Sequence, residues 1–182
     1  MDCIQLINLL IAALALTLAT FTFWQINLKP GRLSVVCGSK YGVKVDKDGK
    51  VHIYVNVTFQ NSGAITVLVK NLRICFADVL VYEFSEIIEA LQPIETQLFN
   101  EKLYEPRGRA VATSFSVQGH SVVNFWILFK GEEPKGETAG NLEFLASNNK
   151  DWQTLKPIPI HFTDYPHIAA EMERDKILLL RH

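Results

Sequence analysis

The chain has 182 residues, with 18 basic and 19 acidic side chains and a formal net charge of −1. This balance produces no strong positive field, so it argues against a nucleic-acid-binding protein, and we expect no nucleic-acid partner. Apart from a long apolar segment at the N-terminus, about 150 residues remain, which is the size of one folded domain.

Residues 1–28 are predicted to be a transmembrane anchor. No charged residue lies between Cys3 and Leu28, and about 20 apolar residues in a helix span the ~30 Å hydrocarbon core of a bilayer. A cleavable signal peptide is the alternative. It is disfavoured because the start of the chain carries Asp2 and no Lys or Arg, and because bulky residues follow Ala19 where a cleavage site needs small ones. We therefore expect a single-pass protein of the cell membrane, in contact with the lipid bilayer.

Basic residues follow the apolar segment, whereas none precedes it. Because basic flanks stay on the cytoplasmic side, this predicts an N-terminus outside the cell and a cytoplasmic folded domain. A folded domain can also be translocated despite a modest charge bias, so an extracytoplasmic domain is the alternative. The basic residues are Lys29, Arg32, Lys40, Lys44 and Lys47.

Small and polar residues recur along the apolar segment at alternating spacings of three and four positions. Such a stripe lets two helices approach closely, and its amide side chains can form hydrogen bonds between helices. It predicts a helix contact with a second copy or with another protein. The alternative is that Ala and Thr are simply common in membrane helices. The stripe consists of Gln5, Asn8, Ala12, Ala15, Ala19 and Thr22.

A short linker at residues 29–32 leads into residues 33–165, which are predicted to form a β-rich domain. The clearest strand is 51–59, where every odd position is Val, Ile or Phe and every even position is His, Tyr, Asn or Thr. A period of two places one face of the strand in the core. The other predicted strands are 33–37, 41–45, 67–76, 111–117, 121–129 and a hairpin over 142–162.

Three of these strands have distinguishing features. The apolar pattern of strand 67–76 changes phase midway, which predicts a bulge near residues 70–71. Strand 121–129 is nearly all apolar, as expected of a central strand buried on both sides. Pro157 and Pro159 in the last strand predict that it lies at a sheet edge.

Two segments of the domain region are predicted not to be strands. Residues 77–108 have no clean period and are predicted to be an irregular insertion, with one or two helical turns at 85–91. A loop of this length is usually functional or packed as its own small layer. Residues 166–182 are predicted to be a C-terminal helix, because Pro166 suits a first helical turn and no breaker follows.

About seven short strands separated by turns predict an all-β fold, an antiparallel β-sandwich of immunoglobulin-like type. Phe23-Trp24-Gln25 before a basic exit, residues 55–63 and residues 115–121 carry a resemblance of pattern over most of the chain. On these residues the chain resembles small bacterial membrane proteins of unassigned function, which have an N-terminal transmembrane helix and an immunoglobulin-like domain. The resemblance implies that fold and an anchored topology, and no catalytic residue.

No pattern predicts an enzyme, a metal site or a cofactor. Residues 131–138 have the glycine spacing of a phosphate-binding loop, but Glu137 stands where that loop needs Lys. His161, Asp164 and His167 could bind a metal, but nothing else in the sequence completes a ligand shell, so we favour a helix cap by Asp164.

Cys37 and Cys75 fall in predicted strands. In an oxidising compartment they could form a disulfide between sheets. The odd number of cysteines and the predicted cytoplasmic domain favour free, buried thiols instead.

Two groups of residues are candidates for a protein interface. His52, Tyr54, Asn56 and Thr58 share the polar face of one strand, and aromatic and polar groups of this kind suit protein contacts. The second group lies on the insertion and consists of Leu98, Phe99, Leu103 and Tyr104. The alternative is that the insertion folds over that strand face and buries both groups together.

These patterns predict a non-enzymatic single-pass membrane protein whose β-sandwich binds another protein, as an accessory subunit of a membrane assembly. The alternative is a membrane-tethered β-sandwich that binds a small ligand or a lipid, with residues 84–108 as a lid over a cavity.

Overall fold

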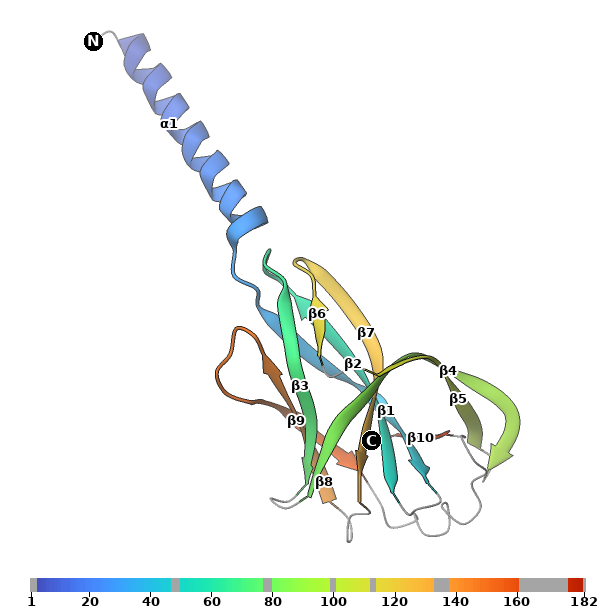
Figure 1. The fold of residues 1–182 in the computed structure, drawn as a ribbon. Helices are drawn as coiled ribbons and strands as arrows, with labels where there is room; N and C mark the ends of the chain where they lie inside the picture. The colour runs from blue at the N-terminus through green and yellow to red at the C-terminus, as the bar shows by residue number, and fades with distance from the viewer. Residues whose placement is uncertain are drawn as a thin grey trace.

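The structure is a computed structural model, which describes residues 3–46, 50–76, 80–98, 101–111, 114–132, 138–160 and 177–181. These residues form one N-terminal helix followed by an antiparallel β domain (Figure 1). Helix α1 covers Cys3–Phe23, and a π-helical turn, η1, continues it over Trp24–Leu28. The predicted division into an apolar helix and a β-rich domain is confirmed at this level.

The described strands join into a single sheet in the order β5-β10-β1-β2-β7-β4-β3-β8-β9, with β6 paired to β3. Because β5 also pairs with β4, the sheet is nearly closed and barrel-like. The strands are β1 (Leu33–Val45), β2 (Val51–Asn61), β3 (Val67–Phe76), β4 (Leu80–Leu98), β5 (Glu101–Val111), β6 (Phe115–Val117), β7 (Ser121–Gly131), β8 (Thr138–Ala146), β9 (Gln153–Ile160) and β10 (Ile177–Arg181).

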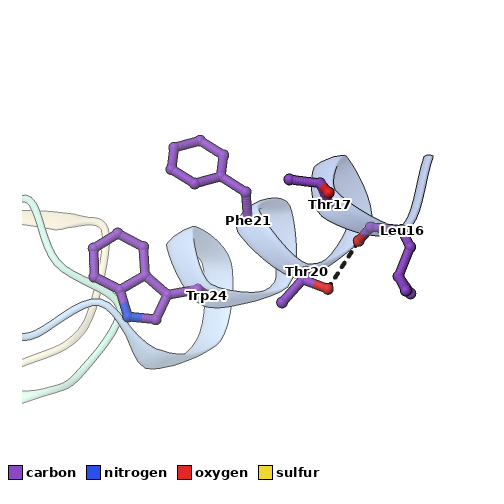
Figure 2. Close-up of a pocket in the computed structure, with 5 residues that line it drawn as sticks. All are labelled: Leu16, Thr17, Thr20, Phe21 and Trp24. Atoms are coloured by element: carbon purple, nitrogen blue, oxygen red, sulfur yellow. Dashed lines mark hydrogen bonds between the residues drawn. The ribbon is translucent and has the colours of Figure 1, made fainter. Parts of the chain in front are cut away.

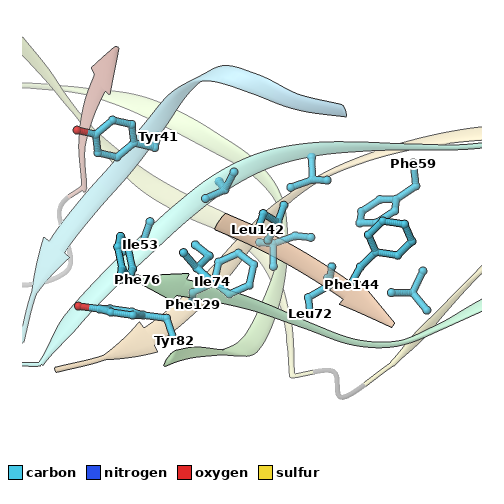
Figure 3. Close-up of a cluster of buried hydrophobic side chains, with 14 of the residues drawn as sticks. Tyr41, Ile53, Phe59, Leu72, Ile74, Phe76, Tyr82, Phe129, Leu142 and Phe144 are labelled. Atoms are coloured by element: carbon cyan, nitrogen blue, oxygen red, sulfur yellow. The ribbon is translucent and has the colours of Figure 1, made fainter. Parts of the chain in front are cut away.

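Strand β2 organises the main core because it pairs with β1 on one side and with β7 along its whole length on the other. Its odd-numbered side chains, such as Ile53 and Phe59, are fully buried. They pack against side chains of β3 and β8, including Leu72, Ile74 and Phe144 (Figure 3). The main core therefore lies between the β1–β2–β7 part of the sheet and the β3–β8 part.

A second, smaller core lies on the opposite face of β2 and β7. It forms because Tyr54 and Leu128 point away from the main core, toward Ile88 of β4 and Ile177 of β10. Trp126 and Tyr104 pack against this cluster. Strands β4, β5 and β10 thus cover one half of this opposite face of β2 and β7, onto which the even-numbered side chains of β2 point.

Several sequence predictions are confirmed strand by strand. The period-two pattern of 51–59 falls within β2. The register of β3 shifts between Val69 and Asn71, as the change of phase predicted. Strand β9, with Pro157 and Pro159, pairs with β8 alone among the described strands and ends the sheet order.

The prediction of an irregular insertion at residues 77–108 is wrong for its described residues, 80–98 and 101–108. Strands β4 and β5 form a long hairpin there, and residues 85–91 are strand rather than helical turns. The pairing register shifts between Phe84 and Glu86 and again between Pro93 and Gln97. These irregularities disrupt the alternation that would otherwise have indicated a strand.

The prediction of a C-terminal helix is corrected at residues 177–181, which form β10 between β1 and β5. A run of apolar residues fits a strand covered on both faces as well as a helix, and pairing with β1 decides between them. Residues 166–176 lie outside the described residues. The immunoglobulin-like sandwich is not confirmed, since the strands belong to one continuous sheet.

The junction between helix and domain is built around the side chain of Asn61, which is only 1% exposed. Its oxygen accepts hydrogen bonds from the backbone N–H groups of Arg32 at 3.2 Å and Gly63 at 3.1 Å. Its nitrogen donates to the carbonyls of Ile65 at 2.9 Å and Val117 at 3.1 Å. One side chain therefore joins the linker, the β2–β3 connection and β6.

The linker itself is hydrogen-bonded to the domain. The Lys29 carbonyl accepts the N–H groups of Ala64 at 2.9 Å and Ile65 at 3.3 Å. Gly63 lies so close to Pro30 that an added Cβ would overlap the Pro30 carbonyl. Residues 29–32 are thus a docked segment rather than a free tether.

Replacement of Asn61 should weaken the whole domain. We expect Asn61→Ala to lower the free energy of unfolding by about 3 kcal/mol, because it leaves buried backbone groups without partners. Urea unfolding of the full chain in detergent, followed by tryptophan fluorescence, measures this loss. Asn56→Ala, at a half-buried position, is the control and should cost no more than about 1 kcal/mol. Equal losses for both variants would contradict the role of Asn61.

The assignment of residues 177–181 to a strand gives a second prediction. Ile177 is fully buried in the second core, so Ile177→Ala should cost about 2–4 kcal/mol in free energy of unfolding. Leu179→Ala, at a half-buried position of the same strand, should cost less. The same urea titration separates the two, and a negligible loss at Ile177 would exclude β10 as part of the core.

Candidate functional site

Helix α1 is exposed along its described length and carries no charged side chain. Two of its three hydroxyl groups are satisfied within the helix, because Thr17 donates to the Ala13 carbonyl and Thr20 to the Leu16 carbonyl, each at 2.8 Å. Internal hydrogen bonding of this kind is what a polar side chain needs in a lipid environment. By length and composition the Cys3–Leu28 segment could cross a membrane, and a signal sequence would meet the same description.

A shallow hollow lies on the helix surface between Leu16 and Trp24. Figure 2 shows the Phe21 and Trp24 rings beside it, with Thr17 and Thr20 on the adjoining turns. The two ring centroids are 6.3 Å apart. The hollow is open and mostly apolar, and it lies outside the β domain, so it is not an enclosed ligand site. Trp24 lies at the end of the helix nearest the domain, where an interfacial aromatic residue is expected.

The small-and-polar stripe is placed on α1 as predicted, and all of its members are exposed. A contact with a partner helix stays a prediction. The members are Gln5, Asn8, Ala12, Ala15, Ala19 and Thr22.

Half of the predicted interface in the domain is not on the surface. Tyr54, Leu103 and His52 are buried. Tyr104 packs against the second core. Strands β4, β5 and β10 cover this part of β2, so the alternative of joint burial describes Tyr54 and Tyr104, and the prediction of an exposed surface at these four residues is corrected.

The two remaining members of the insertion group give no further evidence. Leu98 ends β4, but its side chain is outside the described residues, as is all of Phe99.

The other half of the β2 face is open. Asn56 and Thr58 lie in the part of β2 nearer the helix, where they join a network with Asn124 of β7. The Asn56 and Asn124 amides donate to each other at 2.9 and 3.0 Å, and Asn124 also donates to the Thr58 hydroxyl at 2.7 Å. Strand pairing places Val36 opposite Thr58 and Val122 opposite Gln60. These valines are 61% and 62% exposed.

We call this surface the open face. It has no charged side chain, and its polar atoms are arranged between two exposed valines. It consists of Ser34, Val36, Asn56, Thr58, Gln60, Val122 and Asn124.

The open face exists because the covering strands stop short of it. Strand β10 pairs with β1 only at residues 40–43, and β4 pairs with β7 only at residues 126–130. Among the described strands, none continues over the helix-proximal half of β1, β2 and β7. Sequence reasoning found Asn56 and Thr58 but missed the residues from β1 and β7, because strand pairing alone brings them alongside. The sequence signal that could have indicated this surface is Val36, an apolar residue at a position where alternation along β1 points the side chain away from the core.

A row of charged groups crosses the sheet farther from the helix. His52 lies between Lys44 and Lys130 in the strand register, and Lys130 forms an ion pair with Glu86 at 3.1 Å. Burial lowers the pKa of His52, and the charges of Lys130 and Lys44 lower it further, against an opposing effect of Asp46 and Glu86. Within the described residues no group of His, Cys, Asp and Glu could hold a metal ion. We interpret the row as charge at a sheet face that the Lys130–Glu86 ion pair compensates in part.

The cysteines are free thiols in this structure. Burial raises the pKa of Cys37 to about 11, and burial together with the nearby Glu143 carboxylate raises the pKa of Cys75. At neutral pH both thiols remain protonated and are weak nucleophiles. The predicted metal alternative at residues 161–167 lies outside the described residues.

No protein-family model matches this chain, and no curated protein matches it in sequence. The function is therefore inferred from the residues and geometry described above.

Burial of His52 predicts a contribution to acid sensitivity. Its folded-state pKa lies below the ordinary value of about 6.5, so on acidification the unfolded chain takes up a proton before the folded chain does. Stability should therefore fall as the pH drops from about 7 toward 5, and His52→Gln should flatten this part of the profile. Urea unfolding across the range measures it. His120→Asn, at an exposed turn position, should keep the original slope; an unchanged slope in His52→Gln would contradict the prediction.

Proposed function

We propose that this chain is a non-enzymatic, single-pass membrane protein whose β domain binds another protein, as an accessory subunit of a membrane assembly. The observation that carries the proposal is the open face, where Val36 and Val122 flank the network of Asn56, Thr58 and Asn124.

Single exposed apolar residues are normal on a protein surface, so the valines alone would mean little. Their setting supports an interface. The amides between them are already hydrogen-bonded to one another on paired strands, which keeps the surface ordered and lowers the entropy lost when a partner binds. The absence of charge on this face also removes the desolvation cost that a buried ion would impose.

The N-terminal segment supports a membrane location for this interface. We propose that Cys3–Leu28 is an uncleaved anchor, because the chain reaches the domain through a docked linker instead of a small-residue cleavage site. The basic residues after the helix favour a cytoplasmic domain, with an extracytoplasmic domain as the alternative. The stripe on α1 would add a contact within the membrane with the same partner or with a second copy.

The immunoglobulin-like fold and the alternative ligand-binding function have unequal support. The packing of two parts of the sheet around the main core supports a relationship to immunoglobulin-like sandwiches, which stays a prediction. The alternative function, a ligand site under a lid at residues 84–108, has weaker support. The described part of that segment packs on Tyr54 and Leu128, which are buried in a side-chain cluster.

The proposal predicts a partner that is lost on altering the open face. Purification of the full chain in mild detergent from cells that produce it should recover a specific membrane protein. Val122→Lys should reduce that recovery at least about tenfold, because a buried unpaired charge costs more than about 1.4 kcal/mol. Val81→Lys is the control, since Val81 is 46% exposed and lies where β3 ends and β4 begins, at the end of the domain away from the helix. A lone monomer, or equal recovery with both variants, would contradict the proposed function.

A further inference from the structure

We propose that the end of the β domain facing the helix is a second membrane contact, in which the β2–β3 connection (residues 62–66) places Ile65 among anionic phospholipid headgroups. This inference rests on the proposed membrane anchor and adds a surface of the folded domain to it.

The docked linker fixes the position of this connection. The Lys29 carbonyl, one residue after η1 ends at Leu28, accepts the N–H of Ile65. The Ile65 carbonyl in turn accepts a hydrogen bond from Asn61. The connection is therefore held directly beside the end of the helix (Figure 1).

The length of the helical segment determines how close this connection lies to the membrane. The 26 residues of Cys3–Leu28 would extend roughly 39 Å at about 1.5 Å per residue, which exceeds the ~30 Å hydrocarbon core. Trp24 and the residues after it would then lie at the interface, as Trp prefers. Because the linker is docked, no polar spacer separates the domain from the headgroups.

Ile65 is the apolar element of this surface. It is 50% exposed and lies between the exposed residues Ser62 and Thr66, in a connection where polar side chains are usual. Its backbone is held at both N–H and carbonyl, so the side chain projects from a fixed position.

Two further connections contribute to the charge at this end of the domain, because hydrogen bonds tie them to it. The His120 N–H donates to the Gly63 carbonyl at 2.9 Å, and the Asn148 amide donates to the Gly31 carbonyl at 2.8 Å.

Basic residues outnumber acidic ones on this end. In the described segments 29–32, 62–66, 118–120 and 147–152, the basic residues are Lys29, Arg32 and Lys150, and the acidic residue is Asp151. An exposed apolar side chain at the same end of a domain as basic groups is typical of surfaces that bind anionic lipid.

The test uses spin labels on the full chain in vesicles of phosphatidylcholine and phosphatidylglycerol. Labels are placed at Ile65→Cys, at Val81→Cys as a matched exposed position at the far end of the domain, and at Leu14→Cys within the helix, all with Cys3→Ser. The pKa values of Cys37 and Cys75 are raised, so these thiols react slowly near neutral pH. The Cys3→Ser chain without an added cysteine measures their background.

We expect the Leu14 label to be accessible to oxygen and protected from a water-soluble nickel complex. The Ile65 label should show intermediate protection, and the Val81 label none. Omitting phosphatidylglycerol should reduce protection at Ile65 and leave Leu14 unchanged.

If Ile65 is as accessible to nickel as Val81 while Leu14 stays protected, the second contact is wrong and the anchor stands. If Leu14 is also accessible, the anchor is wrong and the inference fails with it. Protection at Ile65 that is independent of phosphatidylglycerol overturns the anionic-headgroup part of the proposal.

Discussion

The four hydrogen bonds of the Asn61 side chain connect the parts of this protein that the chain itself separates. Burying an amide is costly unless all of its polar atoms are paired, and here each bond reaches a different backbone group. The linker, the β2–β3 connection and β6 are therefore held in one arrangement. Because the helix leads straight into this junction, the orientation of the β domain relative to the helix depends on it.

The side chains of β2 point alternately to the two faces of the sheet. Odd-numbered residues of β2 fill the main core, while even-numbered residues face the other way and meet β4, β5 and β10 only in the helix-distal half. One strand thus contributes to two cores and to the open face. The open face is a consequence of where the covering strands end, because the polar pattern of β2 is the same in both halves.

This geometry would link the proposed membrane attachment to the proposed partner binding. The open face and the connection that carries Ile65 both lie in the half of the domain next to the helix. A docked linker leaves the domain little freedom to turn, so a face of this kind would stay directed toward neighbours in the same membrane. The functional proposals concern surfaces rather than a catalytic centre, in keeping with cysteines that stay protonated and with charged groups that compensate one another.

The sequence by itself determined the apolar helix, the β2 and β3 strands with the bulge between Val69 and Asn71, and the proline-containing edge strand, because each depends on local periodicity or on backbone chemistry. Only the tertiary structure decided the roles of β4, β5 and β10. Register shifts disrupted the pattern of β4, and a short apolar run such as residues 177–180 suits helix and strand alike until a partner strand is present. The candidate site divided in the same way: the sequence identified Asn56 and Thr58, but pairing and coverage buried Tyr54 and brought Val36, Val122 and Asn124 alongside them, since neighbours across a sheet are set by long-range contacts.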